Sequence, residues 1–212
     1  SIPTTYGSLL SDSGRKRFES TNSLITTFNV SSRKINASLR NLVIVVLSFI
    51  YKSFGREVSS FIPLIITQTL KQLKKERTNA LNLATLLTTV IRNGGSHEVT
   101  DSIASKFVKL LKSVGDVEVQ AELMNSLGIV SSANKLDPLT YKASFLSAFA
   151  LGLSSDSGRF RQNAAKALSE SLSNLTYNLK DTVDIVIELY IETTDSRQQI
   201  GVLEAIINFF AL

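Results

Sequence analysis

The helical character of this chain is clearest in residues 139–175, LTYKASFLSAFALGLSSDSGRFRQNAAKALSESLSNL, where two apolar stripes flank the polar turn 154–158. In the second half, apolar residues recur at spacings of 4, 3, 1, 4 and 3, which places them on one side of a helix with a 3.6-residue period: Phe160, Ala164, Ala167, Leu168, Leu172 and Leu175. The first half carries a similar stripe made of Leu139, Leu146, Phe149, Ala150 and Leu153. The segment therefore predicts one helical hairpin.

Looser copies of this hairpin occupy most of the remaining chain. We expect residues 1–16 to be irregular, because they are rich in Ser, Thr and Gly and carry few apolar residues. Glycines mark the breaks between hairpins, as at Gly55 and at the Asn93-Gly94-Gly95 helix stop. The predicted hairpins cover residues 17–54, 57–93, 98–133, 138–176 and 180–212.

A fixed spacing relates the five hairpins. The residues that begin each second helix lie 44, 41, 41 and 38 residues apart: Arg33, Arg77, Glu118, Arg159 and Arg197. A period of this size is typical of two-helix repeats. A lone hairpin cannot bury both sides of its helices, so each repeat is stable only against its neighbours. We therefore predict an all-α fold, a right-handed α-solenoid of about five hairpins in a single array.

The phrase SSDSGRFRQNAAKALSESLSNL resembles the second half of a HEAT or armadillo repeat, in which a polar turn with Asp precedes an Arg and an alanine-rich stripe. Five residues carry this resemblance: Asp156, Arg161, Ala164, Ala167 and Leu168. The stretch GDVEVQAELMNSLGIV is similar, with Asp116, Ala121 and Leu127, but Gln120 replaces the Arg. Two-helix spacing favours the HEAT form. The resemblance implies a HEAT-like scaffold that holds partner proteins on an elongated surface.

Residue counts argue against catalysis and against a cofactor. The chain has no Cys and one His, so it lacks thiol nucleophiles and the usual zinc ligands. His97 lies in a loop between hairpins, and base catalysis needs an oriented partner that the sequence does not supply. No phosphate loop or nucleophile elbow is present. We therefore expect no enzyme activity, no metal and no cofactor.

The longest uninterrupted apolar stretch is short. It runs from Leu42 to Leu47, well below the ~20 residues of a membrane-spanning helix. The first residues lack the order of a secretory signal, and the absence of Cys suits the cytoplasm or the nucleus. We expect no membrane span and an intracellular protein. The chain begins without Met, so we also expect it to be part of a longer protein.

Charge varies along the chain more than its total suggests. Residues 1–77 have a net charge of +8, residues 78–175 of +1, and residues 176–212 of −4. Basic residues concentrate at the turns inside hairpins: Arg33, Lys34, Lys74, Lys75, Arg77, Arg159 and Arg161. Cations at a helix N-terminus oppose the macrodipole, so local stability does not explain them. We predict that they bind an acidic partner, although Arg161 has an alternative role in pairing with Asp156 or with an acid of a neighbouring turn.

The last helix, IGVLEAIINFFAL, is apolar on nearly all sides. Terminal repeats of free-standing solenoids normally present a polar outer face. We therefore expect the end formed by Phe209, Phe210 and Leu212 to contact further repeats or another subunit. The alternative is that this helix folds over the last hairpin and closes it.

Three kinds of function fit these features. The leading one is a non-catalytic protein-binding scaffold. A tubulin-binding TOG-like domain would share the basic hairpin turns, but such domains usually place a Trp on the first turn and this chain has none. Nucleic-acid binding through the basic N-terminal half is less favoured, because the basic turns lack interleaved aromatic residues.

Overall fold

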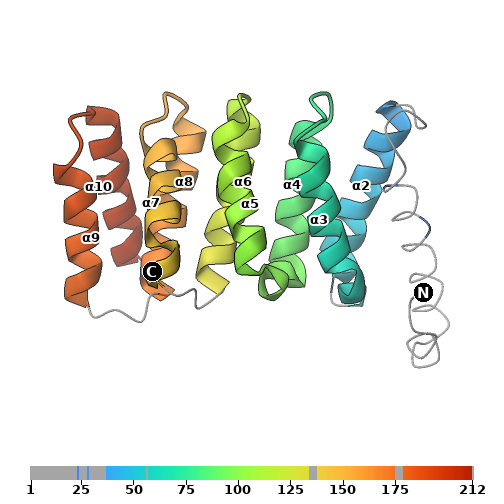
Figure 1. Cartoon of the computed structure of the whole chain (residues 1–212), viewed down its shortest axis with the longest axis horizontal. Coiled ribbons are helices and arrows are strands. Elements are labelled where there is room, and N and C mark those ends of the chain that lie inside the picture. The colour runs from blue at the N-terminus through green and yellow to red at the C-terminus, as the bar shows by residue number, and fades with distance from the viewer. Residues whose placement is uncertain are drawn as a thin grey trace. The chain divides into compact units, whose positions relative to one another are not determined.

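The computed structural model describes Ser23, Phe28 and residues 37–55, 57–133, 138–174 and 179–211. These residues form nine α-helices, α2 to α10, and no strand (Figure 1). The chain is therefore all-α, as its sequence predicts. The helices divide into two compact units, one ending at Gly95 and the other beginning at Ser96.

The first unit contains α2 (Ala37–Phe54), α3 (Ile62–Leu73) and α4 (Ala80–Val90), with a turn of 3-10 helix at Ser59–Phe61. Both α2 and α3 pack against α4, and their apolar stripes meet in a core that includes Ile44, Leu47, Ile65, Ile66, Leu83 and Leu87. The chain leaves α4 through Ile91–Gly95, where Gly94 has a φ of 127°. Glycine adopts this backbone conformation readily, so the helix stop predicted at Gly94 is confirmed.

Two buried hydroxyls in the described part of this unit have no hydrogen-bond partner, those of Tyr51 and Thr69. Tyr51 on α2 has no exposed surface, and its hydroxyl has no hydrogen-bond partner among the described residues. Burial raises the pKa of this hydroxyl above its usual range, because the phenolate is poorly solvated there. An unsatisfied buried hydroxyl costs free energy that a phenyl ring would avoid.

We therefore expect Tyr51→Phe to raise the free energy of unfolding by about 1 kcal/mol. Urea denaturation followed by circular dichroism measures this change. Tyr190→Phe is the control, because Tyr190 is exposed and its hydroxyl is hydrated in both states. A loss of stability in Tyr51→Phe would show that the hydroxyl has a partner in solution.

The second unit contains α5 (Asp101–Ser113), α6 (Val117–Ala133), α7 (Pro138–Leu153), α8 (Gly158–Asn174), α9 (Leu179–Ile191) and α10 (Ser196–Ala211), after a short turn at Ser96–Glu98. Consecutive helices run antiparallel (Figure 1). The second helices of successive hairpins pack against each other, α6 on α8 and α8 on α10. Phe160, Ala164, Ala167, Leu168 and Leu172 are all buried in these contacts, as their spacing predicts.

Small residues allow these helices to approach closely. A Cβ atom added at Gly128 on α6 would lie 2.8 Å from Cβ of Ala167 on α8. A Cβ atom added at Gly152 on α7 would lie 2.5 Å from Cβ of Ala164 on α8. The alanines therefore face glycines, and both partners of each contact need to be small.

Nine of the ten predicted hairpin helices lie wholly or largely in the described ranges, and eight of them pair as α3–α4, α5–α6, α7–α8 and α9–α10. The second helix of the first hairpin is α2. The first helix of that hairpin falls outside the described residues except for Ser23 and Phe28, as do residues 1–16. Phe28 is buried, and its carbonyl accepts a hydrogen bond from Gln72 on α3.

Candidate functional site

Polar contacts between successive hairpins of the second unit repeat at nearly constant sequence separation. Arg159 at the start of α8 pairs with Glu118 at the start of α6, and Arg197 at the start of α10 pairs with Asp156 before α8. Both pairs span 41 residues. Deeper in the same interface, the Nδ2 of Asn163 donates to the Ala121 carbonyl at 2.8 Å, and the hydroxyls of Ser131 and Ser171 lie 2.5 Å apart.

The first unit contains contacts of the same kind. The Nδ2 of Asn79 donates to the Ala37 carbonyl at 3.4 Å, and the Nδ2 of Asn82 donates to Oδ1 of Asn41 at 2.6 Å. Asn79 and Asn163 each reach back 42 residues, from one second helix to the preceding one. Each unit is therefore held together by contacts in a register of about 41 residues, which we call the register contacts.

Three of the residues predicted to bind a partner lie exposed after α3. Lys74, Lys75 and Arg77 occupy the turn between α3 and α4, and we call them the turn surface. Glu76, between them, points inward and lies 3.9 Å from Nε of the buried Arg40. The turn surface is therefore cationic. Arg33 and Lys34, predicted to belong to the same edge, lie outside the described residues.

The remaining two predicted binding residues make contacts within the chain. Arg159 pairs with Glu118 and, at 3.3 Å, with Glu122. Arg161 donates from Nη1 to the Ser155 carbonyl at 2.9 Å, in its own hairpin. The predicted pairing of an Arg with an acid of the neighbouring turn thus exists, but Arg159 and Arg197 make it instead of Arg161. These contacts within the chain account for the presence of Arg159 and Arg161 at the turn, so neither residue requires an external binding partner to explain it.

Gln120 occupies the position that corresponds to Arg161 and makes a similar bond. Its Nε2 donates to the Leu111 carbonyl near the end of α5 at 3.2 Å. Gln198 on α10 likewise donates to the Leu189 carbonyl near the end of α9 at 3.4 Å. Each of these three side chains links the second helix of its hairpin to the first helix or to the turn before the second helix. The amides of Gln120 and Gln198 therefore make the kind of bond that the guanidinium of Arg161 makes.

A second basic surface lies on α5 and was not predicted. Lys106, Lys109 and Lys112 are exposed and spaced by three residues along one side of the helix, opposite its buried side. We call them the lysine row. The Nζ of Lys112 donates to the Ser147 hydroxyl on α7 at 2.8 Å. The helix α7 contains no acidic residue, and the only acidic residue of α5 is Asp101 at its start. The lysine row therefore has no acidic neighbour close to it on either helix.

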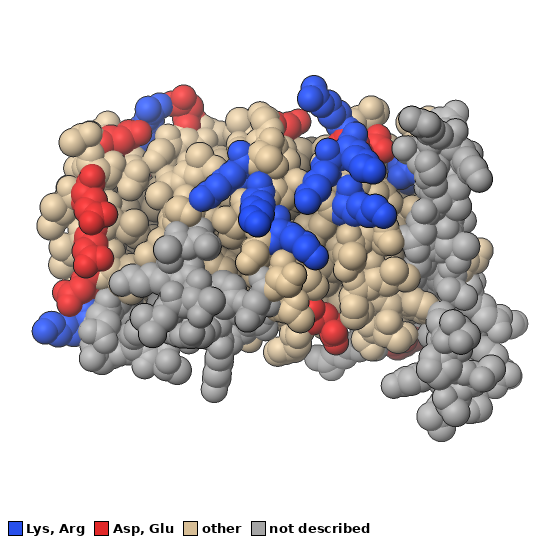
Figure 2. All heavy atoms as spheres, in the orientation of Figure 1, with Lys and Arg blue, Asp and Glu red and all other residues tan. Residues whose placement is uncertain are grey.

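Acidic residues gather elsewhere in the same unit. Asp184, Glu188 and Glu192 are exposed at four-residue spacing, the first two on α9 and Glu192 directly after it. Figure 2 shows acidic side chains along α9 and basic side chains over α3 and over α5, which belong to different units. At the following turn, the backbone N–H of Arg197, and then its guanidinium, hold the pKa of the Asp195 carboxyl below its usual range. The second unit is therefore acidic at α9 and basic at α5.

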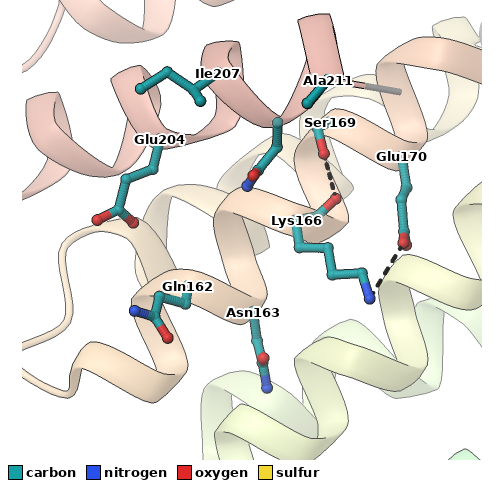
Figure 3. A pocket seen from close by; sticks show the side chains of 9 residues that line it. Gln162, Asn163, Lys166, Ser169, Glu170, Glu204, Ile207 and Ala211 are labelled. Atoms are coloured by element: carbon teal, nitrogen blue, oxygen red, sulfur yellow. Dashed lines mark hydrogen bonds and ion pairs between the residues drawn. The ribbon is translucent and has the colours of Figure 1, made fainter.

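A groove of about 660 Å³ lies between α8 and α10. Figure 3 shows Gln162, Asn163 and Lys166 on one side and Glu204 and Ile207 on the other. Lys166 lies 3.7 Å from Glu170 one turn along α8, and Asn163 is used in a register contact. The groove is therefore a seam between two packed helices, and three of its polar lining groups, Asn163, Lys166 and Glu170, bond to α6 or within α8.

Neither a metal site nor a catalytic group emerges in the part of the chain that the structure describes. No three His, Cys, Asp or Glu residues lie close enough there to hold a metal ion. His97 is exposed in the short turn Ser96–Glu98, so no neighbouring element encloses it.

One described helix is long and apolar enough to cross a membrane by length and composition. It is α2, with 18 residues and a mean hydropathy of 1.4, of which 28% is buried. A core helix of a soluble protein passes the same test. The absence of a membrane span therefore stays a prediction.

Comparisons with known proteins give a fold and no family. No protein-family model matches the chain, and no curated protein matches it. A crystal structure described as an engineered protein, a target of the Northeast Structural Genomics Consortium, is similar with a TM-score of 0.54 and 16% identity. The similarity covers 90% of this chain and 79% of the engineered one, and it extends to the fold alone.

Proposed function

We propose that the chain is a non-catalytic protein-binding scaffold whose hairpins stack as a HEAT-like α-solenoid. The register contacts support the stacking, because they join equivalent positions of successive hairpins in both units. An array of this kind presents a broad surface made of many helices. A protein with such a surface is suited to holding other proteins.

The lysine row carries the proposal about the partner. Three lysines on one rigid helix, with Lys112 held by Ser147, form a cationic strip without acidic neighbours on α5 or α7. Such a strip attracts an anionic partner and orients it. We propose that the partner is a protein segment that presents carboxylates along one side of a helix.

A protein partner fits this surface better than a nucleic acid. Leu151 on α7 is partly exposed, so the neighbouring helix offers an apolar contact of the kind found at the centre of protein interfaces. The exposed positions of α5 include no aromatic residue on which bases could stack. Tubulin-like acidic partners fall within the same class, since they are proteins with acidic surfaces.

Binding of two labelled probes tests this proposal. One probe is an amphipathic helical peptide with glutamates on one side and leucines on the other, and the second is a DNA duplex of similar charge. We expect the peptide to bind more tightly at physiological salt and to lose less affinity than the duplex between about 50 and 200 mM salt. Tighter binding of the duplex at the higher salt concentration would favour a nucleic-acid function instead.

A further inference from the structure

Exposed large apolar side chains concentrate on two surfaces. Among the described residues, one surface is the outer side of α2 and carries Leu39, Leu42, Val45 and Phe49. The other is the outer side of the α9–α10 hairpin, with Val183, Ile187, Tyr190, Ile191, Ile200, Leu203, Ile207 and Phe210. Clusters of this size mark interaction sites on soluble proteins. Four other exposed large apolar residues are scattered singly over α3, α4, α6 and α7.

The α2 residues form one stripe opposite the packed side of the helix. Val43, Ile44, Leu47 and Tyr51 bury one side of α2 in the first unit. Leu39, Leu42, Val45 and Phe49 follow at spacings of 3, 3 and 4 and lie on the other side. Phe49 is 64% exposed. We call these four residues the α2 stripe.

The outer side of α10 carries a matching stripe. Gly201, Val202 and Ala205 bury one side of α10, and the opposite side presents Ile200, Leu203, Ile207 and Phe210 at spacings of 3, 4 and 3. Phe210 is 71% exposed and packs edge to face on Phe209, with ring centroids 5.4 Å apart. We call these four residues the α10 stripe. Of the three residues at the predicted assembly end, Phe210 belongs to this stripe, Phe209 packs against it, and Leu212 lies outside the described residues.

Packing within each unit shows how these two stripes would meet. The second helix of one hairpin packs against the second helix of the next, as α6 does on α8, α8 on α10, and α2 on α4. Both α2 and α10 are second helices, and among the described residues each packs on only one of its two sides. The side that remains on α10 is the one that would accept a following second helix, and the side that remains on α2 would accept a preceding one.

Charge favours joining these two surfaces to each other rather than each to itself. The helical spacing places Asp184 and Glu188 beside the exposed apolar side of α9, with Glu192 directly after the helix. Figure 2 shows acidic side chains along α9. Residues 176–212 have a net charge of −4, and residues 1–77 have a net charge of +8. Two α9–α10 hairpins face to face would bring like charges together, whereas one hairpin against the basic first unit brings opposite charges together.

We propose that the α10 stripe of one copy docks on the α2 stripe of a second copy, so that the chain associates head to tail. This inference goes beyond the proposed scaffold function and does not depend on the lysine row. Because the two stripes are different surfaces of the chain, the association is heterologous and generates either a closed ring or an open filament. A contact between two helices buries less than the roughly 1,200–2,000 Å² of a standard complex, so the association is weak and depends on concentration.

Complementation between two variants tests this proposal. Phe49→Glu places a carboxylate in the α2 stripe, and Ile207→Glu places one in the α10 stripe. Both positions are exposed, so circular dichroism should show unchanged helicity for each variant. Sedimentation velocity of the unmodified chain at up to about 100 µM is expected to show species larger than a monomer, and each variant alone is expected to remain monomeric.

An equimolar mixture of the two variants is expected to form a 1:1 dimer and nothing larger. Ile207→Glu keeps an intact α2 stripe and Phe49→Glu keeps an intact α10 stripe, so one junction forms and the remaining modified surfaces repel each other. Leu64→Glu and Leu151→Glu are the matched controls, because these exposed leucines lie outside both stripes. Both controls are expected to associate like the unmodified chain.

Four results would overturn the proposal. The unmodified chain could remain monomeric, or the mixture could form no dimer. Continued self-association of either variant alone would point to a contact between identical surfaces. Binding of the unmodified chain to vesicles of phosphatidylcholine and phosphatidylserine, with loss of that binding in Phe49→Glu, would identify a membrane as the occupant of the α2 stripe.

Discussion

Gly152→Leu is expected to lower the free energy of unfolding by about 3 kcal/mol and the melting temperature by roughly 10 °C. A Cβ at this position already lies 2.5 Å from Cβ of Ala164 and 3.1 Å from Met124 and Phe160 side-chain atoms. A leucine would therefore force α7 and α8 apart, and the interior has no free volume to accept it. Thermal and urea denaturation followed by circular dichroism measure the change.

Gly115→Leu provides the control for this prediction. Gly115 lies in the exposed turn before α6, and a Cβ there meets no atom within 4 Å. The same substitution should therefore change stability by less than about 0.5 kcal/mol. Equal stability of the two variants would mean that α7 and α8 do not approach as closely in solution as they do in the structure.

Reversal of the lysine row is expected to weaken binding of the glutamate-and-leucine peptide by at least about 100-fold. The variant is Lys106→Glu with Lys109→Glu and Lys112→Glu. Each substitution replaces attraction by repulsion, so the effect exceeds that of removing the charges. Stability should change little, because exposed charges contribute little to folding. Fluorescence anisotropy with the labelled peptide measures the affinity.

The turn surface supplies a comparison with the same change in charge. Lys74→Glu with Lys75→Glu and Arg77→Glu also alters the net charge by six units, but in the first unit. If the lysine row is the site, this second variant should lose no more than about tenfold through the change in overall field. A larger loss in the turn-surface variant would move the site to the hairpin turns, where the sequence first suggested it.

Much of the fold follows from apolar periodicity. The stripe from Phe160 to Leu172 and the stop at Gly94 both depend on neighbours close in sequence, so the sequence predicts them directly. The sequence also predicts the repeat spacing, because equivalent turns recur about every 41 residues. The register contacts, such as the hydrogen bond from Asn163 to the Ala121 carbonyl, join equivalent positions of successive hairpins at this spacing.

Details that depend on packing between hairpins are harder to predict. Whether Arg159 or Arg161 reaches the neighbouring acid depends on which side of α8 faces α6, and the two positions differ by half a helical turn. Gly128 and Gly152 look like weak points of helices in the sequence, and only the facing alanines explain them. Ala164 and Ala167 themselves belong to the stripe that the sequence predicts, so one half of each contact was predicted.

The lysine row was not predicted, because a net charge summed over a long segment hides cations that lie on a single helix. The segment that contains it, residues 78–175, is nearly neutral overall, since Glu118, Glu122 and other acids balance the lysines. Glu118 and Glu122 lie on α6, whereas the three lysines lie on α5. A test for cations at three-residue spacing on each predicted helix would have found Lys106, Lys109 and Lys112.

Successive hairpins within each unit pack in a register of about 41 residues, and disulfide trapping tests this packing directly. The chain has no Cys, so Ser131→Cys with Ser171→Cys adds the only thiols, at positions whose hydroxyls lie 2.5 Å apart. Such proximity suits a disulfide. We predict rapid intramolecular oxidation, seen by mass spectrometry, and slow oxidation when Ser173→Cys, on the exposed side of α8, replaces Ser171→Cys. Equal rates for the two pairs, or no disulfide in the first, would contradict the register.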